Sequence, residues 1–130
     1  MTPTLRRVPA TLPDRDAVAA LLGREPIADF DIVVRRPDGA PVVIRNDPFT
    51  LDGTPMPTRY WLVDPEWNRA VSRLEAAGGV REAETTVDPA AVTAAHAVYA
   101  AERDAAIAPG ARGPRPFGGV GGTREGVKCL

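Results

Sequence analysis

The sequence predicts an α+β fold in which a small antiparallel sheet of about three strands packs against two main helices. Two runs rich in β-branched residues flank a Pro-Asp-Gly-Ala turn, which is typical of a hairpin. Two longer segments repeat apolar residues at helical spacing, and each opens with Asp-Pro. Seven of the 12 glycines lie after residue 108. We therefore expect one α+β domain over residues 1–108, followed by a Gly/Pro-rich cationic tail over residues 109–130.

The first expected element is a short helix that begins after Thr11. Thr11 and Asp14 have the spacing of a capping box, in which each side chain accepts a hydrogen bond from the backbone of the other residue. Val18 and Leu22 lie on one helical face, and Gly23 is typical of a helix end.

The strands follow this helix. Residues 30–36 and 41–45 are expected to pair around a turn at residues 37–40, where Pro presets φ and Gly accepts a positive φ. Residues 46–58 hold three prolines and a glycine, so we expect a rigid loop. Residues 59–63 then have the pattern of a third short strand.

Two longer helices are expected in the second half of the domain. Asp64 and Asp88 each precede a proline, which places a capping carboxylate before a residue whose missing N–H costs nothing at the first helical position. The apolar spacing predicts helices over residues 64–78 and 88–108. Residues 80–87 between them alternate in character, and we interpret them as a strand.

Three aromatic residues bracket the junction between the third strand and the first of these helices. We expect Tyr60, Trp61 and Trp67 to be buried there, because large side chains supply area where a core is thin. The only histidine, His96, is expected on the surface of the second long helix.

The composition excludes several classes of protein. A formal net charge of -1 argues against a chain-wide basic surface, so nucleic-acid binding is not expected. One cysteine excludes an intramolecular disulfide framework, and no apolar run approaches the roughly 18 residues of a membrane span. The N-terminus has no apolar core behind its arginines, so we expect no secretory signal and a cytoplasmic protein without membrane contact.

The only lysine and the only cysteine stand side by side as Lys128 and Cys129. The positive neighbour would lower the pKa of the Cys129 thiol and favour the nucleophilic thiolate. A structural or incidental cysteine explains the same position, and nothing in the sequence brings His96 to the tail as a base. Both interpretations stay open.

Glycines within residues 118–122 suggest an anion-binding nest, in which backbone N–H groups converge on a phosphate. Arg115, Arg124 and Lys128 would add positive charge to such a nest. A Walker-type nucleotide loop is excluded, because a valine precedes the lysine and a thiol stands where the hydroxyl is needed. The alternative is a plain flexible tail, which is the common outcome of this composition.

A metal site is not expected. One histidine and one cysteine do not complete a coordination shell. The carboxylates Asp29 and Asp31, like Glu82 and Glu84, alternate as on strands and most simply form solvated faces. The residues indicate no particular cofactor.

Residues 43–80, VIRNDPFTLDGTPMPTRYWLVDPEWNRAVSRLEAAGGV, and the final GGVGGTREGVKCL resemble a bacterial family that is common in actinobacteria. It is catalogued as domain of unknown function five hundred and one. The resemblance covers most of residues 32–130, and its most specific strings are Pro-Thr-x-Tyr-Trp-Leu and Gly-Val-Lys-Cys-Leu. The family has no established activity. Its members are often encoded near a septum-formation protein and an exopolyphosphatase, so the resemblance implies a link to cell division or polyphosphate metabolism.

The chain departs from the family pattern at two places. In members of the family the Gly-Val-Lys-Cys-Leu string runs on into His-x-His, so the resemblance implies a chain truncated after Leu130. Many members also carry a cysteine before the proline of the central helix, where this chain has Asp64, and another near residues 35–36. Of the metal or redox site that these residues would form in relatives, this chain keeps Cys129 alone.

Two functions follow as hypotheses. The first is a noncatalytic accessory or interaction module with a protein partner, since these residues form no complete catalytic constellation. The second is a phosphate-handling or thiol- or metal-dependent enzyme, whose site would form where the loop of residues 46–58 meets the tail and would be incomplete here. Its candidate residues are Arg45, Asp47, Asp52, Thr58, Arg59, Lys128 and Cys129.

The enzyme hypothesis assigns roles by chemical type. Carboxylates would hold a cation or act as bases, and arginines would clamp phosphate or polyphosphate bidentately. The anion-binding set is Arg45, Arg59, Arg115, Arg124 and Lys128. In the simpler alternative, Asp47 and Asp52 cap turns and pair with Arg45 and Arg59.

Overall fold

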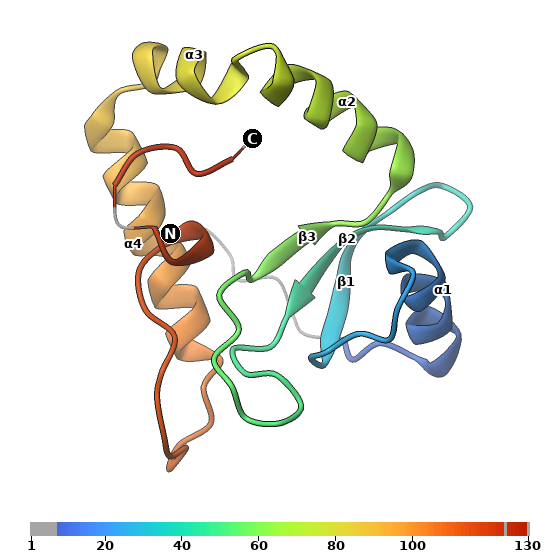
Figure 1. Cartoon of the computed structure of the whole chain (residues 1–130). Coiled ribbons are helices and arrows are strands. Elements are labelled where there is room, and N and C mark those ends of the chain that lie inside the picture. Colours follow the sequence, from blue (N-terminus) through green and yellow to red (C-terminus); the bar gives the residue numbers. More distant parts are fainter. Residues whose placement is uncertain (1–7, 124, 130) are drawn as a thin grey trace.

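The computed structural model describes residues 8–123 and 125–129. It confirms the α+β class, with one antiparallel sheet of strand order β1-β2-β3 (Figure 1). The elements in chain order are α1 (Leu12–Leu22), β1 (Phe30–Arg35), β2 (Pro41–Asn46), β3 (Tyr60–Leu62), α2 (Pro65–Ala76), α3 (Gly79–Thr86), α4 (Pro89–Ala105) and the short 3-10 helix η1 (Val120–Gly122).

The β1–β2 hairpin is confirmed. Phe30 pairs with Asn46 and Ile32 with Ile44, after which the register shifts toward the turn. Gly39 takes the positive φ of 92° that the turn requires, and no other residue type adopts that backbone readily. β3 pairs with β2 and forms an edge of the sheet.

The apolar core lies between α1 and the sheet. Val18 from α1 packs with Phe30, Ile44 and Val63, all buried. The expected capping box of Thr11 and Asp14 is present, so α1 begins at a defined residue and presents Val18 to the sheet. The sequence predicted packing of the sheet against the two later helices only, so the packing of α1 on the sheet was not expected.

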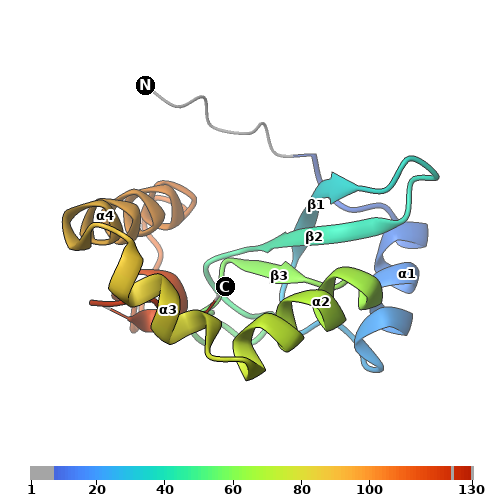
Figure 2. The ribbon, with the colours of Figure 1, turned by 90° about the horizontal axis from the view of Figure 1, so that it is seen from above.

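Both Asp-Pro helices are confirmed. The Asp64 side chain accepts a hydrogen bond from the Trp67 N–H, and the Asp88 side chain accepts one from the Ala90 N–H. α2 and α3 bury none of their described residues. They carry the chain to α4, on the side of the sheet away from α1 (Figures 1 and 2).

The strand expected at residues 80–87 is wrong, because Gly79–Thr86 forms helix α3. Its alternation is too short to separate a strand period from a helical one, and Val80, Ala83 and Val87 also fit helical spacing. The segment is joined to α2 through Gly78 at a φ of 90°, and it adds no strand to the described sheet. The helix satisfies its backbone hydrogen bonds locally.

The expectation for Trp67 is also wrong, since this residue is 56% exposed. Trp61 packs against the apolar core, and the Arg24 guanidinium lies 5.5 Å from its ring centroid. Trp67 stands in the first turn of α2, whose apolar stripe does not meet the core.

The described part of the tail packs against α4. The Arg103 side chain donates to the Gly118 carbonyl at 2.8 Å, and η1 contacts α4.

His96 is 7% exposed, so its expected place on the helix surface is wrong. Its Nδ1 accepts from the Val120 N–H at 3.1 Å, and its Nε2 donates to the Gly126 carbonyl at 2.7 Å. These contacts assign the proton of the neutral ring to Nε2.

Close backbone approach explains a glycine in this tail. A Cβ on Gly119 would lie 2.3 Å from His96 Nδ1, which no side chain tolerates. The tail therefore forms part of the fold through His96 and Arg103. No helix within residues 8–123 and 125–129 combines the length and apolar character needed to cross a membrane.

Candidate functional site

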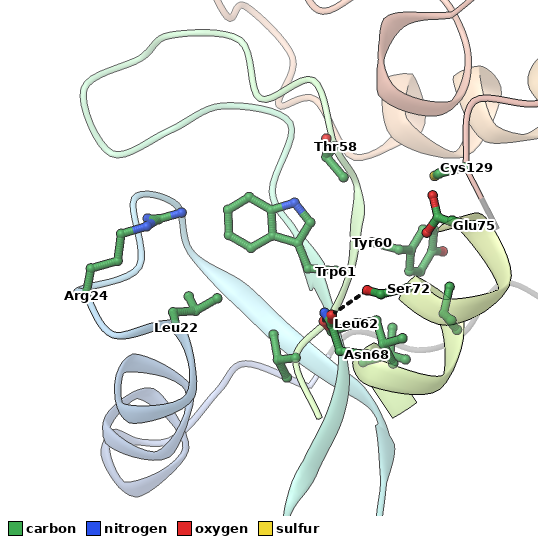
Figure 3. Close-up of a pocket in the computed structure, with 13 residues that line it drawn as sticks. Leu22, Arg24, Thr58, Tyr60, Trp61, Leu62, Asn68, Ser72, Glu75 and Cys129 are labelled. Atoms are coloured by element: carbon green, nitrogen blue, oxygen red, sulfur yellow. Dashed lines mark hydrogen bonds between the residues drawn. The ribbon is translucent and has the colours of Figure 1, made fainter. Parts of the chain in front are cut away.

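A pocket of about 610 Å³ lies between β3 and α2 (Figure 3). Trp61, with Leu22 and Arg24 beside it, forms one end, and Tyr60, Glu75 and Cys129 lie toward the other. The volume is within the roughly 300–1,000 Å³ typical of small-molecule sites. Its lining is mainly apolar with a few polar groups, which is the usual composition of a binding pocket.

Four α2 side chains line the pocket, and three of them are polar: Asn68, Ser72 and Glu75, with Val71. Asn68 donates from its amide to the Leu62 carbonyl at the edge of β3, at 3.1 Å. The Ser72 hydroxyl donates to the Asn68 side-chain oxygen at 3.3 Å. The first bond holds α2 beside β3, and the second, within α2, orients the Asn68 side chain.

A buried polar cluster lies behind the pocket and shares Tyr60 with it. Arg45 and Asp31 are each 4% exposed and form a bidentate pair, with Nη2–Oδ2 at 2.6 Å and Nε–Oδ1 at 3.1 Å. Tyr60 lines the pocket with its side chain and donates its hydroxyl to Glu102 on α4. The Glu102 Oε1 atom is 3.7 Å from both Arg45 Nη1 and Arg59 Nε.

Arg59 connects this cluster to the loop and to α4. Its Nη1 donates to the Asn46 carbonyl at 2.7 Å, and its backbone N–H donates to the Tyr99 hydroxyl. The Tyr99 hydroxyl in turn donates to the Pro57 carbonyl. Arg59 is 8% exposed, and its Nε has no hydrogen-bond partner among the described residues. The nearby carboxylate of Glu102 compensates its charge.

The electrostatics of the cluster favour fixed ion pairs. The hydrogen bonds from Arg45 to Asp31 raise the pKa of Arg45, so its charge persists at all ordinary pH values. Burial raises the pKa of Tyr60, and the hydrogen bond to Glu102 adds to that rise. Tyr60 is therefore a neutral donor near pH 7. Two arginines and two carboxylates balance, and the arrangement joins α4 to the sheet.

Asp31 and Glu102 are the members of the cluster that sequence reasoning missed. Asp31 was expected on a solvated face, but it is buried. A signal existed, because the hairpin register places Asp31 directly opposite Arg45. Glu102 carried no such signal, since its partners come from strands distant in sequence.

The predicted candidates are only partly brought together. Thr58 and Cys129 line the same pocket, where the loop meets the tail. Arg45 and Arg59 lie in the buried cluster behind it. Cys129 is exposed.

The two loop carboxylates lie apart from this pocket. Asp52 accepts from the Thr50 hydroxyl and the Thr54 N–H, and the hydrogen bond from Thr50 is the main cause of its lowered pKa. This supports the turn-capping alternative for Asp52. Asp47 is half-buried, and its backbone N–H donates to the Asp29 carbonyl. The bidentate partner of Arg45 is Asp31, not a loop carboxylate.

The anion-binding nest remains a prediction. Within residues 118–123, the N–H groups of Gly119, Gly122 and Thr123 donate to tail carbonyls, and that of Val120 donates to His96. Arg115 and Lys128 are exposed, and Arg124 lies outside the described residues. Among the residues that the structure describes, no group of three or more His, Cys, Asp and Glu is placed to hold a metal ion.

The model of one protein family, described as Protein of unknown function (DUF501), matches residues 32–130. The chain belongs to the DUF501 family. The match covers both the β3–α2 junction and the tail that packs on α4. Comparisons of this DUF501 protein with curated proteins and with solved structures give no match. The family description carries no activity, so function has to be argued from the site.

Proposed function

We propose that this DUF501 protein is a noncatalytic cytoplasmic interaction module that binds a protein partner through α2 and the adjoining pocket. The observation that carries the proposal is the exposed apolar stripe of α2. The stripe consists of Trp67, Ala70 and Leu74; Trp67 and Leu74 are 56% and 59% exposed, and Val71 on the flank of the stripe lines the pocket. A surface helix ordinarily turns such a stripe toward a core.

α2 is held firmly although its apolar stripe is open. Arg36 binds Asp64, the capping residue of α2, through two hydrogen bonds of 2.7 Å, and it also binds Glu66 at 2.8 Å. Asn68 fixes the helix to β3. A partner would therefore meet a preorganised surface, and little ordering entropy would oppose binding.

The surroundings of the pocket support a binding role over a catalytic one. Both ring nitrogens of His96 are engaged by the tail backbone, so this imidazole is not positioned as a base for Cys129. The Tyr60 hydroxyl is committed to Glu102. We take the partner to belong to cell division or polyphosphate metabolism, the association that the family resemblance implies.

A paired substitution tests this proposal. Trp67→Glu with Leu74→Glu places two charges on the stripe, and we expect it to abolish recovery of the partner in crosslinking pulldowns from the native host. Val98→Glu is the matched control, because Val98 is 64% exposed on α4 and should leave recovery unchanged. Circular dichroism and Tm confirm that each variant folds. Recovery that survives the stripe variant, or no partner at all, would contradict the proposal.

A second candidate function is thiol-dependent chemistry at Cys129. It is favoured by the meeting of Thr58 and Cys129 at one pocket, where the loop and tail were expected to form a site. Alkylation by iodoacetamide over a pH series tests it. A reaction midpoint well below the ordinary thiol value of about 8.5 supports an activated nucleophile, and an ordinary midpoint removes this candidate.

The phosphate-handling form of this second candidate draws on the exposed cations of the tail. Calorimetric titration with inorganic phosphate and with polyphosphate tests it, using Arg115→Ala with Lys128→Ala as the comparison. Binding that falls in this variant and weakens with added salt supports the role. Binding of neither probe to the unaltered protein removes it.

A further inference from the structure

We propose that the α2 surface selects an acidic amphipathic helix of the partner protein. This inference rests on the proposed function and adds the chemistry of the partner. It begins with two arginines, Arg69 and Arg73, that lie one turn apart on α2. Both are exposed, and neither forms a hydrogen bond or ion pair with a side chain in the described part of the protein.

Nearby carboxylates neutralise these arginines only in part, since Asp64 also interacts electrostatically with Arg69. Glu66 lies on the same flank of α2, but its carboxylate binds Arg36 at 2.8 Å. Asp64 is likewise held by Arg36. Arg36, Arg69 and Arg73 outnumber these two carboxylates by one, so this flank keeps a net positive charge beside the apolar stripe. The two exposed arginines have a spacing that suits carboxylates one turn apart on a partner helix.

The order of side chains around α2 makes the two flanks of its apolar stripe chemically different. At about 100° per residue, Trp67, Ala70 and Leu74 form a stripe. Arg69 and Arg73 lie roughly 110° from it on one side, and the residues that line the pocket lie about as far on the other. A partner helix would thus place apolar residues on the stripe and acidic residues on the arginine side only.

The pocket flank of α2 also favours a partner helix whose acidic residues lie on the arginine side only. Glu75 lines the pocket, so an acidic group on that side of a partner would meet a like charge. Apolar side chains suit this flank, because the adjoining wall includes Val71 and Leu62. The surface therefore favours a partner helix whose acidic residues face Arg69 and Arg73, and it repels one whose acidic residues face Glu75.

A second copy of this chain fits the surface less well in an antiparallel arrangement. In an antiparallel pair joined through the stripe, the arginine flank of one copy would face the same flank of the other. Arg69 and Arg73 would then repel their counterparts. A separate partner that supplies carboxylates relieves this repulsion.

The experiment selects ligands from a phage-displayed library of peptides of about 16 residues, roughly four helical turns. The folded protein is the bait. We expect enriched peptides to carry apolar residues at i, i+3 or i+4, and i+7, with Asp or Glu on one flank. Binding of the resynthesised peptides should fall at least about tenfold on Arg69→Glu with Arg73→Glu, and it should weaken as salt rises. Arg81→Glu with Arg112→Glu makes the same charge change at exposed positions outside α2 and should leave binding unchanged.

The outcomes separate this inference from the proposed function. Peptides that depend on Trp67 and Leu74, tested by serine substitutions, but are indifferent to Arg69 and Arg73 overturn the acidic partner and leave the interaction module standing. Enrichment that ignores the stripe, or no enrichment, overturns both. A dimer in sedimentation velocity that Trp67→Ser dissociates identifies a second copy as the occupant and overturns the acidic partner.

Discussion

Replacement of Asp31 by valine tests the assignment of the buried polar cluster as a structural connection. Asp31 and Arg45 balance one another, as do Glu102 and Arg59. Asp31→Val removes one negative charge and leaves an excess positive charge among groups that are largely out of water. Removal of one partner from a buried pair costs about 3–5 kcal/mol. Because Glu102 lies 3.7 Å from Arg45 and remains, we expect the lower end, about 3 kcal/mol.

Removal of both partners should reverse most of this loss. Asp31→Val combined with Arg45→Leu restores charge balance and fills the space with apolar groups, so the double variant should lie within about 1 kcal/mol of the unaltered protein. Asp29→Ala is the surface control, since Asp29 pairs with Arg15 while 58% of its side chain is exposed. Its effect should stay below about 1 kcal/mol.

Urea unfolding at pH 7 measures these free energies. A loss of 3 kcal/mol moves the midpoint by about 2 M, for a slope of about 1.5 kcal/mol per M. The reasoning is refuted by a single variant within about 1 kcal/mol of the unaltered protein, or by a double variant as unstable as the single one. If the double variant is stable and still binds the protein partner, the buried polar cluster takes no part in partner binding.

Three further predictions concern the tail, a helix cap and the core. Gly119→Ala forces a methyl group into the His96 ring, so hydrogen exchange at the Val120 amide should accelerate at least about tenfold, reflecting the loss of one or two hydrogen bonds; unchanged protection would contradict the close packing. The pKa of Asp14 is lowered, chiefly by its hydrogen bond from Arg35, so its contribution to stability is complete above the unfolded value of about 3.9 and is lost as pH falls through the lower folded value. A series of Tm values between pH 2 and 5 should therefore be flatter for Asp14→Asn, and parallel curves would refute the linkage. Ile44→Ala opens a cavity in the core beneath α1 and should cost about 2–5 kcal/mol in urea unfolding, whereas a loss below about 1 kcal/mol would show that the core collapses around it.

Most of the helices and strands that the sequence predicted correctly are specified by signals within a few neighbouring residues. The hairpin around Gly39, the capping box at Thr11 and the Asp-Pro starts of α2 and α4 are all present. Each depends on residues a few positions apart, so no knowledge of packing is needed. α3 was missed because eight residues of weak alternation fit both periods, and the choice depended on whether a partner strand was available.

The site was less accessible to such reasoning. Thr58 and Cys129 were expected to meet, and they line one pocket. The Arg45–Asp31 pair could have been found from the hairpin register, since these residues lie opposite one another. The exposure of the α2 stripe could not, because an amphipathic helix has the same pattern whether its apolar stripe meets its own core or a partner.

By itself, the sequence determined the antiparallel hairpin, the helix starts and the family of the chain, because short-range backbone preferences and recurrent strings carry that information. Only the tertiary structure decided which polar residues leave water. His96, Asp31 and Glu102 acquire their roles when α4 meets the sheet and the tail, and the exposure of Trp67 follows from α2 lying beside the edge strand rather than over the core. Burial depends on contacts between segments far apart in the chain, and no local pattern specifies those contacts.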